Sequence, residues 1–95
     1  MNEYLDSSLN EIIGNVLKRE REKQGLSLEE LSKRMNNKIK RQNIAYYENA
    51  RSRLKLDRFL MICKALHLNP NEVFDEINMR YFKNAKLGGD TNGQI

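Results

Sequence analysis

The fold is decided by residues 27–49, which read SLEELSKRMNNKIKRQNIAYYEN. Ser27 is a favoured helix N-cap, and two glutamates follow it in the first turn, where the helix dipole favours negative charge. The apolar residues that then recur on one helix face are Leu28, Leu31 and Met35. Asparagine tolerates positive φ, so Asn36 and Asn37 predict a turn. In the next segment Ile44 and Tyr47 fall on one face, which leaves Tyr46 outward. The stretch predicts two short helices, 28–35 and 41–49.

Three further helices are expected around this pair. Ser8 and Glu11 have the spacing of a capping box, so the first helix is expected to begin at Ser8 and end at Gly25. A fourth helix over 56–66 and a fifth from Pro70 to Lys86 follow. The residues expected to face inward are Leu9, Ile12, Ile13, Val16 and Leu17 in the first, Leu56, Phe59, Leu60, Ile62, Cys63 and Leu66 in the fourth, and Val73, Phe74, Ile77 and Tyr81 in the fifth. No segment alternates apolar and polar residues, so the fold class is all-α.

Composition limits the function classes. The chain has 95 residues, a net charge of +4 and a pI near 9.3, which allow one compact domain and favour polyanionic partners such as nucleic acid. Cys63 is the single cysteine, so we expect neither a disulfide nor a metal site, and no cofactor. No apolar run approaches the roughly 20 residues that span a bilayer, and the N-terminus is acidic. We therefore expect a cytoplasmic protein without a membrane partner.

Charge is concentrated around the short helix 41–49. Residues 1–17 carry three acids and no base, a charge of −3, whereas residues 38–58 carry seven bases and two acids, a charge of +5. The bases are Lys38, Lys40, Arg41, Arg51, Arg53, Lys55 and Arg58. A charged run is often only a solvated face, but here it flanks one helix on both sides, as phosphate neutralisation around a major-groove helix requires. The outward residues that suit base reading are Arg41, Gln42, Ala45 and Tyr46.

These residues resemble the helix-turn-helix domain of phage repressors and Cro, often called XRE-like. The resemblance covers about residues 12–74 and rests on the order and spacing of several short pieces. They are Ile13-Gly14, Arg21 ahead of Gly25-Leu26-Ser27, Glu29-Glu30-Leu31, Ile44 ahead of Tyr47-Glu48-Asn49, and a helix closing with Ala65-Leu66. The family's fold is a five-helix bundle whose second and third helices form the DNA-binding unit.

The resemblance also implies roles for individual residues. Arg41, Gln42 and Tyr46 match base-contacting positions, and Arg21 matches a residue that pairs with Glu48. The residues expected at the DNA backbone are Arg21, Lys38, Lys40, Asn43, Asn49, Arg51, Arg53 and Lys55. Three departures from the family pattern stand out: a turn from 35 to 44 that is two residues longer, Leu28 in place of a polar residue, and Ala50 and Leu54 where Gly and Pro are frequent.

The expected domain layout is an N-terminal arm at 1–7, a helix-turn-helix DNA-binding domain at 8–74, a C-terminal helix at 75–87 and a mobile tail at 88–95. The last helix, with Met79, Tyr81 and Phe82, either closes the core or forms a dimer seam. His67 is expected to cap the fourth helix, and Cys63 to act as a small buried hydrophobe.

The function expected from all of this is sequence-specific binding of double-stranded DNA by a transcriptional repressor. It would act as a homodimer on an inverted-repeat operator, with no catalysis and no small-molecule substrate. Any signal would arrive through a regulatory protein partner, through dimerisation or through the concentration of the protein. The alternative is a protein-interaction module, an antitoxin or antagonist that uses the same bundle to hold a partner.

Overall fold

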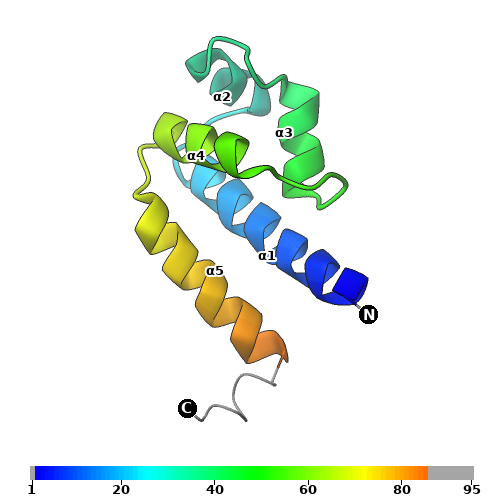
Figure 1. Ribbon diagram of the computed structural model, residues 1–95. Helices are drawn as coiled ribbons and strands as arrows, with labels where there is room; N and C mark the ends of the chain where they lie inside the picture. The colour runs from blue at the N-terminus through cyan, green and yellow to red at the C-terminus, as the bar shows by residue number, and fades with distance from the viewer. Residues whose placement is uncertain (1, 86–95) are drawn as a thin grey trace.

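The computed structural model describes residues 2–85, with side chains from 8 to 83. These residues form five α-helices and no strand (Figure 1), which confirms the expected all-α class. The helices are α1 (Asn2–Lys23), α2 (Leu28–Arg34), α3 (Arg41–Glu48), α4 (Leu56–Ala65) and α5 (Pro70–Ala85).

The long helices α1 and α5 support the short ones. α1 contacts both α3 and α5, and α2 contacts α3. Figure 1 shows α2 and α3 together at one end of the molecule, with α4 between them and α5. The two short helices of the central stretch are thus held as one unit at the C-terminal end of α1.

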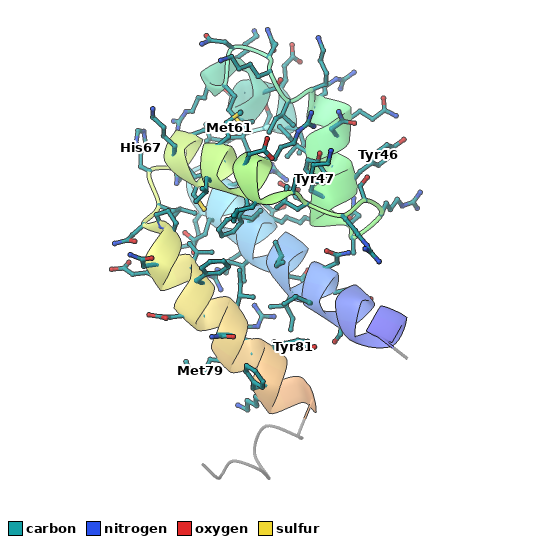
Figure 2. The ribbon with its side chains drawn as sticks, in the orientation of Figure 1. Tyr46, Tyr47, Met61, His67, Met79 and Tyr81 are labelled. Atoms are coloured by element: carbon teal, nitrogen blue, oxygen red, sulfur yellow. The ribbon has the colours of Figure 1, made fainter. Side chains whose placement is uncertain are left out.

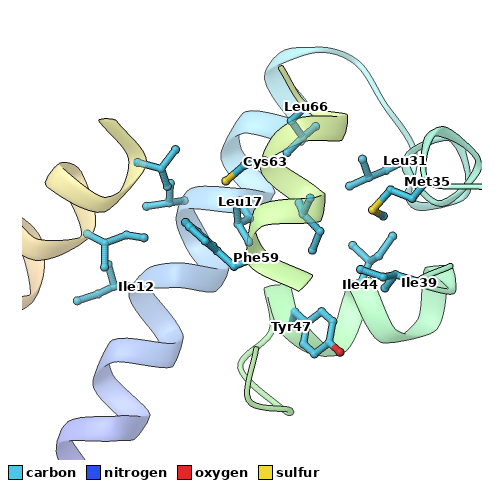
Figure 3. Close-up of a cluster of buried hydrophobic side chains, with 14 residues drawn as sticks. Ile12, Leu17, Leu31, Met35, Ile39, Ile44, Tyr47, Phe59, Cys63 and Leu66 are labelled. Atoms are coloured by element: carbon cyan, nitrogen blue, oxygen red, sulfur yellow. The ribbon is translucent and has the colours of Figure 1, made fainter. Parts of the chain in front are cut away.

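Buried apolar side chains from all five helices meet in one core (Figure 3). They are Ile12, Val16, Leu17, Leu31, Met35, Ile39, Ile44, Tyr47, Phe59, Ile62, Cys63, Leu66, Val73 and Ile77. Each aliphatic side chain contributes about 1.5–3 kcal/mol by leaving water. Ile39 lies in the turn between α2 and α3 and was not among the residues expected in the core. It is 1% exposed, and the Oγ of buried Ser32 donates to its carbonyl oxygen at 2.7 Å. The longer turn is therefore anchored to the core.

Four helices end in the same way, each followed by a residue in the left-handed region, and after α2 the following residue, Asn37, is left-handed as well. The four residues are Gly25 after α1, Asn36 after α2, Ala50 after α3 and His67 after α4, with φ between 56° and 69°. In each case the next amide reaches back to the last turn, as Arg51 N does to Tyr46 O at 2.8 Å and Leu68 N to Cys63 O at 2.8 Å. This is the Schellman arrangement, which glycine adopts most easily. It confirms the predicted turn at Asn36 and Asn37.

The structure corrects several expectations. α1 begins at Asn2 and not at Ser8, so residues 2–7 continue the helix instead of forming an arm. The spacing of a capping box is also that of i, i+3 neighbours inside a helix, and here it marks no end. Leu56 and Leu60 are 62% and 44% exposed, because α4 turns the other edge of its apolar stripe inward. Phe74 is half exposed, although its ring stacks on Phe59 at 5.4 Å. Lys86 and the tail at 88–95 lie outside the described residues.

Candidate nucleic-acid interface

The position of α3 is fixed by a close approach to α1 at Gly14. A Cβ at Gly14 would lie 2.5 Å from the carbonyl oxygens of both Tyr47 and Glu48. Both oxygens belong to the backbone, so no side-chain movement could make room. Glycine at this position is what lets the C-terminal end of α3 pack directly on α1.

A buried ion pair ties the same two helices together. Arg21 on α1 donates from Nε and Nη2 to the two carboxylate oxygens of Glu48 on α3, at 2.7 and 2.9 Å. Its third nitrogen, Nη1, donates to the carbonyl oxygen of Leu26 at 2.7 Å. The hydrogen bonds to Glu48 raise the pKa of Arg21 above its ordinary value. The geometry is the bidentate fork that favours specificity of orientation.

The structure therefore separates Arg21 from the surface bases. Arg21 is 8% exposed, and each of its guanidinium nitrogens already donates within the protein. The expected pairing with Glu48 is present in the geometry. These bonds use three of the five guanidinium N–H groups, and the side chain is buried, so we group Arg21 with the residues that position α3, and its contact with a DNA phosphate stays a prediction.

The two adjacent tyrosines of α3 point in different directions, as the sequence predicted (Figure 2). Tyr47 is 8% exposed in the core, while Tyr46 is 37% exposed. The hydroxyl of Tyr47 accepts a hydrogen bond from Arg58 Nη1 on α4 at 2.8 Å. Through this hydrogen bond Arg58 links α4 to α3. This contact could not be predicted from the sequence, in which Arg58 is only one member of the basic block.

The outward face of α3 carries the residues expected to read bases. Arg41 and Gln42 are exposed in its first turn, and Ala45 is half-buried beside them. The side-chain amide of Gln42 donates from Nε2 to the Tyr46 hydroxyl at 2.8 Å. An amide has two N–H groups and one carbonyl oxygen, so Gln42 keeps one donor and its acceptor for a ligand. That pair is what the N7 and N6 edge of adenine requires.

Exposed bases surround this face. Those in the turn before α3 and in the loop after it are Lys38, Lys40, Arg51, Arg53 and Lys55. Asn43 is half-buried on α3 itself. Asn49 is the C-cap of α3, and its Nδ2 donates to the carbonyl oxygen of Ala45 at 2.9 Å. All the predicted backbone-contacting residues except Arg21 thus lie at the surface or half-buried around α3.

The N-termini of α2 and α3 differ in how they are capped. At α2, the Ser27 Oγ accepts from Glu30 N at 3.0 Å and Glu30 Oε1 accepts from Ser27 N at 2.8 Å, a complete capping box. The i, i+3 spacing of Ser27 and Glu30 is the sequence signal of this capping box. α3 follows Lys40 with no side-chain cap and no acid in its first turn. Its N-terminal amides and positive dipole end therefore meet Lys40 and Arg41, a combination that attracts phosphate.

Other kinds of site find little support in the described residues. No group of three or more His, Cys, Asp or Glu side chains in this part of the chain could hold a metal ion. Cys63 is buried, and burial raises the pKa of its thiol to about 11. Among the helices described, none is both long enough and apolar enough to cross a membrane.

A comparison with protein families matches a family model described as helix-turn-helix to residues 17–73, which are 57 of the 95 residues. The chain belongs to the XRE-like helix-turn-helix family. It is a DNA-binding regulator, and its helix-turn-helix unit consists of α2, the turn at 35–40 and α3. Comparisons with curated proteins and with solved structures gave no match.

Proposed function

We propose that this helix-turn-helix protein is a repressor that binds an inverted-repeat operator in double-stranded DNA as a homodimer, with α3 in the major groove. The observation that supports base reading is the bond between Gln42 and Tyr46 on the exposed face of α3. It holds the Gln42 amide with one donor and one acceptor free for adenine. Arg41, one residue earlier, can form the bidentate contact to guanine.

The exposed bases around α3 supply the contacts that position it. Lys40 lies at the uncapped N-terminus of α3, and Arg51 follows its C-terminal end, so the two charges flank the helix. Such contacts go to phosphates and bring affinity without sequence preference. Base reading and positioning therefore fall on different residues and can be tested separately.

The test compares Arg41→Ala with Arg51→Ala on a selected operator and on random duplex. Arg41→Ala is expected to cost about 1–3 kcal/mol on the operator and little on random DNA. Arg51→Ala is expected to weaken binding to both and to reduce the salt dependence by about one unit of slope. Equal losses on both duplexes for Arg41→Ala would contradict the base-reading role.

Tyr46→Phe tests the role of the hydroxyl without changing the ring. It removes the acceptor that holds Gln42 and leaves the helix and its charges intact. We expect the preference for adenine at one operator position to fall several-fold, while binding to random duplex stays unchanged. A preference that survives the change would mean that the hydroxyl does not position Gln42.

An apolar groove between α1 and α5 supports the homodimer. Its apolar lining includes Leu9, Ile13, Phe74, Ile77, Tyr81 and Phe82. Phe74 and Phe82 keep 50% and 51% of their surface exposed, so one molecule alone leaves much aromatic surface in water. Burying a phenylalanine stabilises by about 1.5–3 kcal/mol, and a two-fold contact would use both rings of each copy.

Sedimentation velocity tests this seam with a matched pair of variants. Phe82→Glu places a charge in the groove and is expected to give a monomer that binds the operator weakly. Met79→Glu makes a similar change on the same helix at a residue that is 66% exposed and outside the groove lining. It should leave the dimer intact. Equal behaviour of the two variants would contradict the proposed seam.

A further inference from the structure

The C-terminal ends of α2 and α4 meet in a shallow hollow, which we call the basic cup and which shares only Lys38 with the residues expected at the DNA backbone. Its basic rim consists of Arg34, Lys38, Lys64 and His67, and its apolar part of Met35 and Met61. The rim residues come from two helix ends and the turns that follow them. The cup is thus built by tertiary packing, and no single run of sequence contains it.

The two lysines of the rim, Lys38 and Lys64, have no acidic partner among the described residues. No carboxylate lines the cup, and within residues 8–83 no ion pair joins Lys38, Lys64 or His67 to an acid. On the α1 and α5 surface the opposite holds, since Arg19 pairs with both Glu20 and Glu76. The cup is therefore a positive surface that no carboxylate lines.

Part of the rim, at Arg34 and His67, is also held in place before anything binds. Arg34 Nη1 donates to the carbonyl oxygen of Ala65 at 2.9 Å and to Gln24 Oε1 at 3.3 Å. Gln24 Nε2 in turn donates to the carbonyl oxygen of Leu66 at 2.7 Å. His67 has its backbone fixed in the left-handed position at the end of α4. A prearranged rim loses less entropy on binding than a mobile one.

The end of the cup at His67 lies away from the base-reading surface. Figure 2 shows His67 and Tyr46 on opposite sides of the helix-turn-helix end of the molecule, with α4 between them. A duplex against the outward face of α3 would therefore leave the rim at His67 accessible. The methionines also distinguish this surface from a phosphate site. A phosphate needs no apolar contact, whereas the thioether side chain of methionine adapts to apolar groups of a protein partner.

We propose that the basic cup docks an acidic segment of a partner protein, one in which carboxylates flank an apolar side chain. The carboxylates would meet Lys38, Lys64 and His67, and the apolar side chain would pack on Met61. Opposite charges at such a surface speed association and select the partner. This contact would let a protein signal reach the regulator while α3 remains on DNA.

The test uses random linear peptides displayed on phage, selected on the full chain and then measured singly by fluorescence anisotropy. Lys64→Glu reverses one rim charge in the last turn of α4. Lys33→Glu is the matched control, since Lys33 is an exposed lysine in the last turn of α2 and does not line the cup. Lys38→Glu, in the turn after α2, repeats the test at a site outside any helix.

We expect enriched peptides with two or more carboxylates around an apolar residue. They should bind the wild type and Lys33→Glu equally, and Lys64→Glu and Lys38→Glu at least fivefold more weakly. Random duplex should bind the wild type and Lys64→Glu within twofold. The proposal is overturned if no acidic peptide is enriched or if all three variants bind peptide equally. It is also overturned if Lys64→Glu weakens duplex binding as much as Arg51→Glu does, because duplex phosphates would then be the ligand.

Discussion

Removing one member of the buried pair between Arg21 and Glu48 should destabilise the fold far more than removing both. The side chains are 10% and 4% exposed, so either one left alone is a charge with little access to water. Breaking a buried ion pair in this way costs about 3–5 kcal/mol, whereas replacing both members by apolar residues is often nearly neutral. The variants are Arg21→Met, Glu48→Leu and the double replacement.

The structure also predicts which single change is worse. In Glu48→Leu, Arg21 keeps its bond to the Leu26 carbonyl oxygen and lies 4.0 Å from the exposed carboxylate of Glu22. In Arg21→Met, the Glu48 carboxylate keeps no partner that the described residues provide at this site. We therefore expect Arg21→Met to lose the full 3–5 kcal/mol or so, and Glu48→Leu to lose less. The double variant should fall within about 2 kcal/mol of the wild type.

Urea denaturation followed by circular dichroism measures these differences. A loss of about 3–5 kcal/mol lowers the melting temperature of a domain of this size by roughly 15–30 °C. Arg19→Met is the control, because Arg19 also donates to a glutamate, Glu76 Oε1 at 2.8 Å, but the two side chains are 43% and 32% exposed. A surface pair contributes about 1 kcal/mol or less. Additive losses for Arg21→Met and Glu48→Leu in the double variant would refute the reasoning.

Three further outcomes follow from the structure. Ala50→Gly should stabilise the fold by about 0.5–1 kcal/mol, because Ala50 has a φ of 58°, which is unfavourable for an L-residue. The control, Ala45→Gly inside α3, should destabilise the fold by about 1 kcal/mol. If thermal melts show a loss of stability for both variants, the backbone of Ala50 is not strained. Gly14→Ala should lower the free energy of unfolding, measured in urea, by about 1–3 kcal/mol, because the added Cβ would meet two backbone oxygens. Alanine has the better helix propensity, so this loss would come from the contact alone. An unchanged urea midpoint would show that α1 and α3 can separate freely. Cys63 should resist a thiol reagent at pH 8 in the native protein and react fully in denaturant, because burial raises the pKa of its thiol to about 11. A rapid reaction of the native protein would mean that the core opens.

Local signals predicted the central helices well. Ser27 caps α2, Asn36 and Asn37 turn the chain, and Tyr46 and Tyr47 separate because consecutive helical residues point about 100° apart. Each of these depends on residues close together in sequence. The same kind of evidence failed at Ser8, where a capping pattern lies inside a helix.

Tertiary packing determines which apolar residues are buried and which side chains contact each other, and neither could be fully predicted from the sequence. The apolar stripe of α4 is wide, and only its neighbours determine that Phe59 turns inward while Leu60 stays exposed. In the sequence, Ile39 is a single apolar residue in a polar turn, and its burial depends on the packing of α2 and α3 around it. The Gln42 to Tyr46 bond and the Arg58 to Tyr47 bond depend on side-chain rotamers. The sequence could propose the residues at the interface but not their mutual contacts.

The central claim is that the outward face of α3 reads a sequence in double-stranded DNA. Selection of bound duplexes from a random pool by the full chain, repeated with Arg41→Ala, tests it most directly. The account predicts a palindromic consensus for the wild type, with half-site centres about 10 base pairs apart or a multiple of that spacing. It also predicts that Arg41→Ala loses preference at one symmetric pair of positions only. A pool that stays random, or a consensus that Arg41→Ala leaves unchanged, would contradict it.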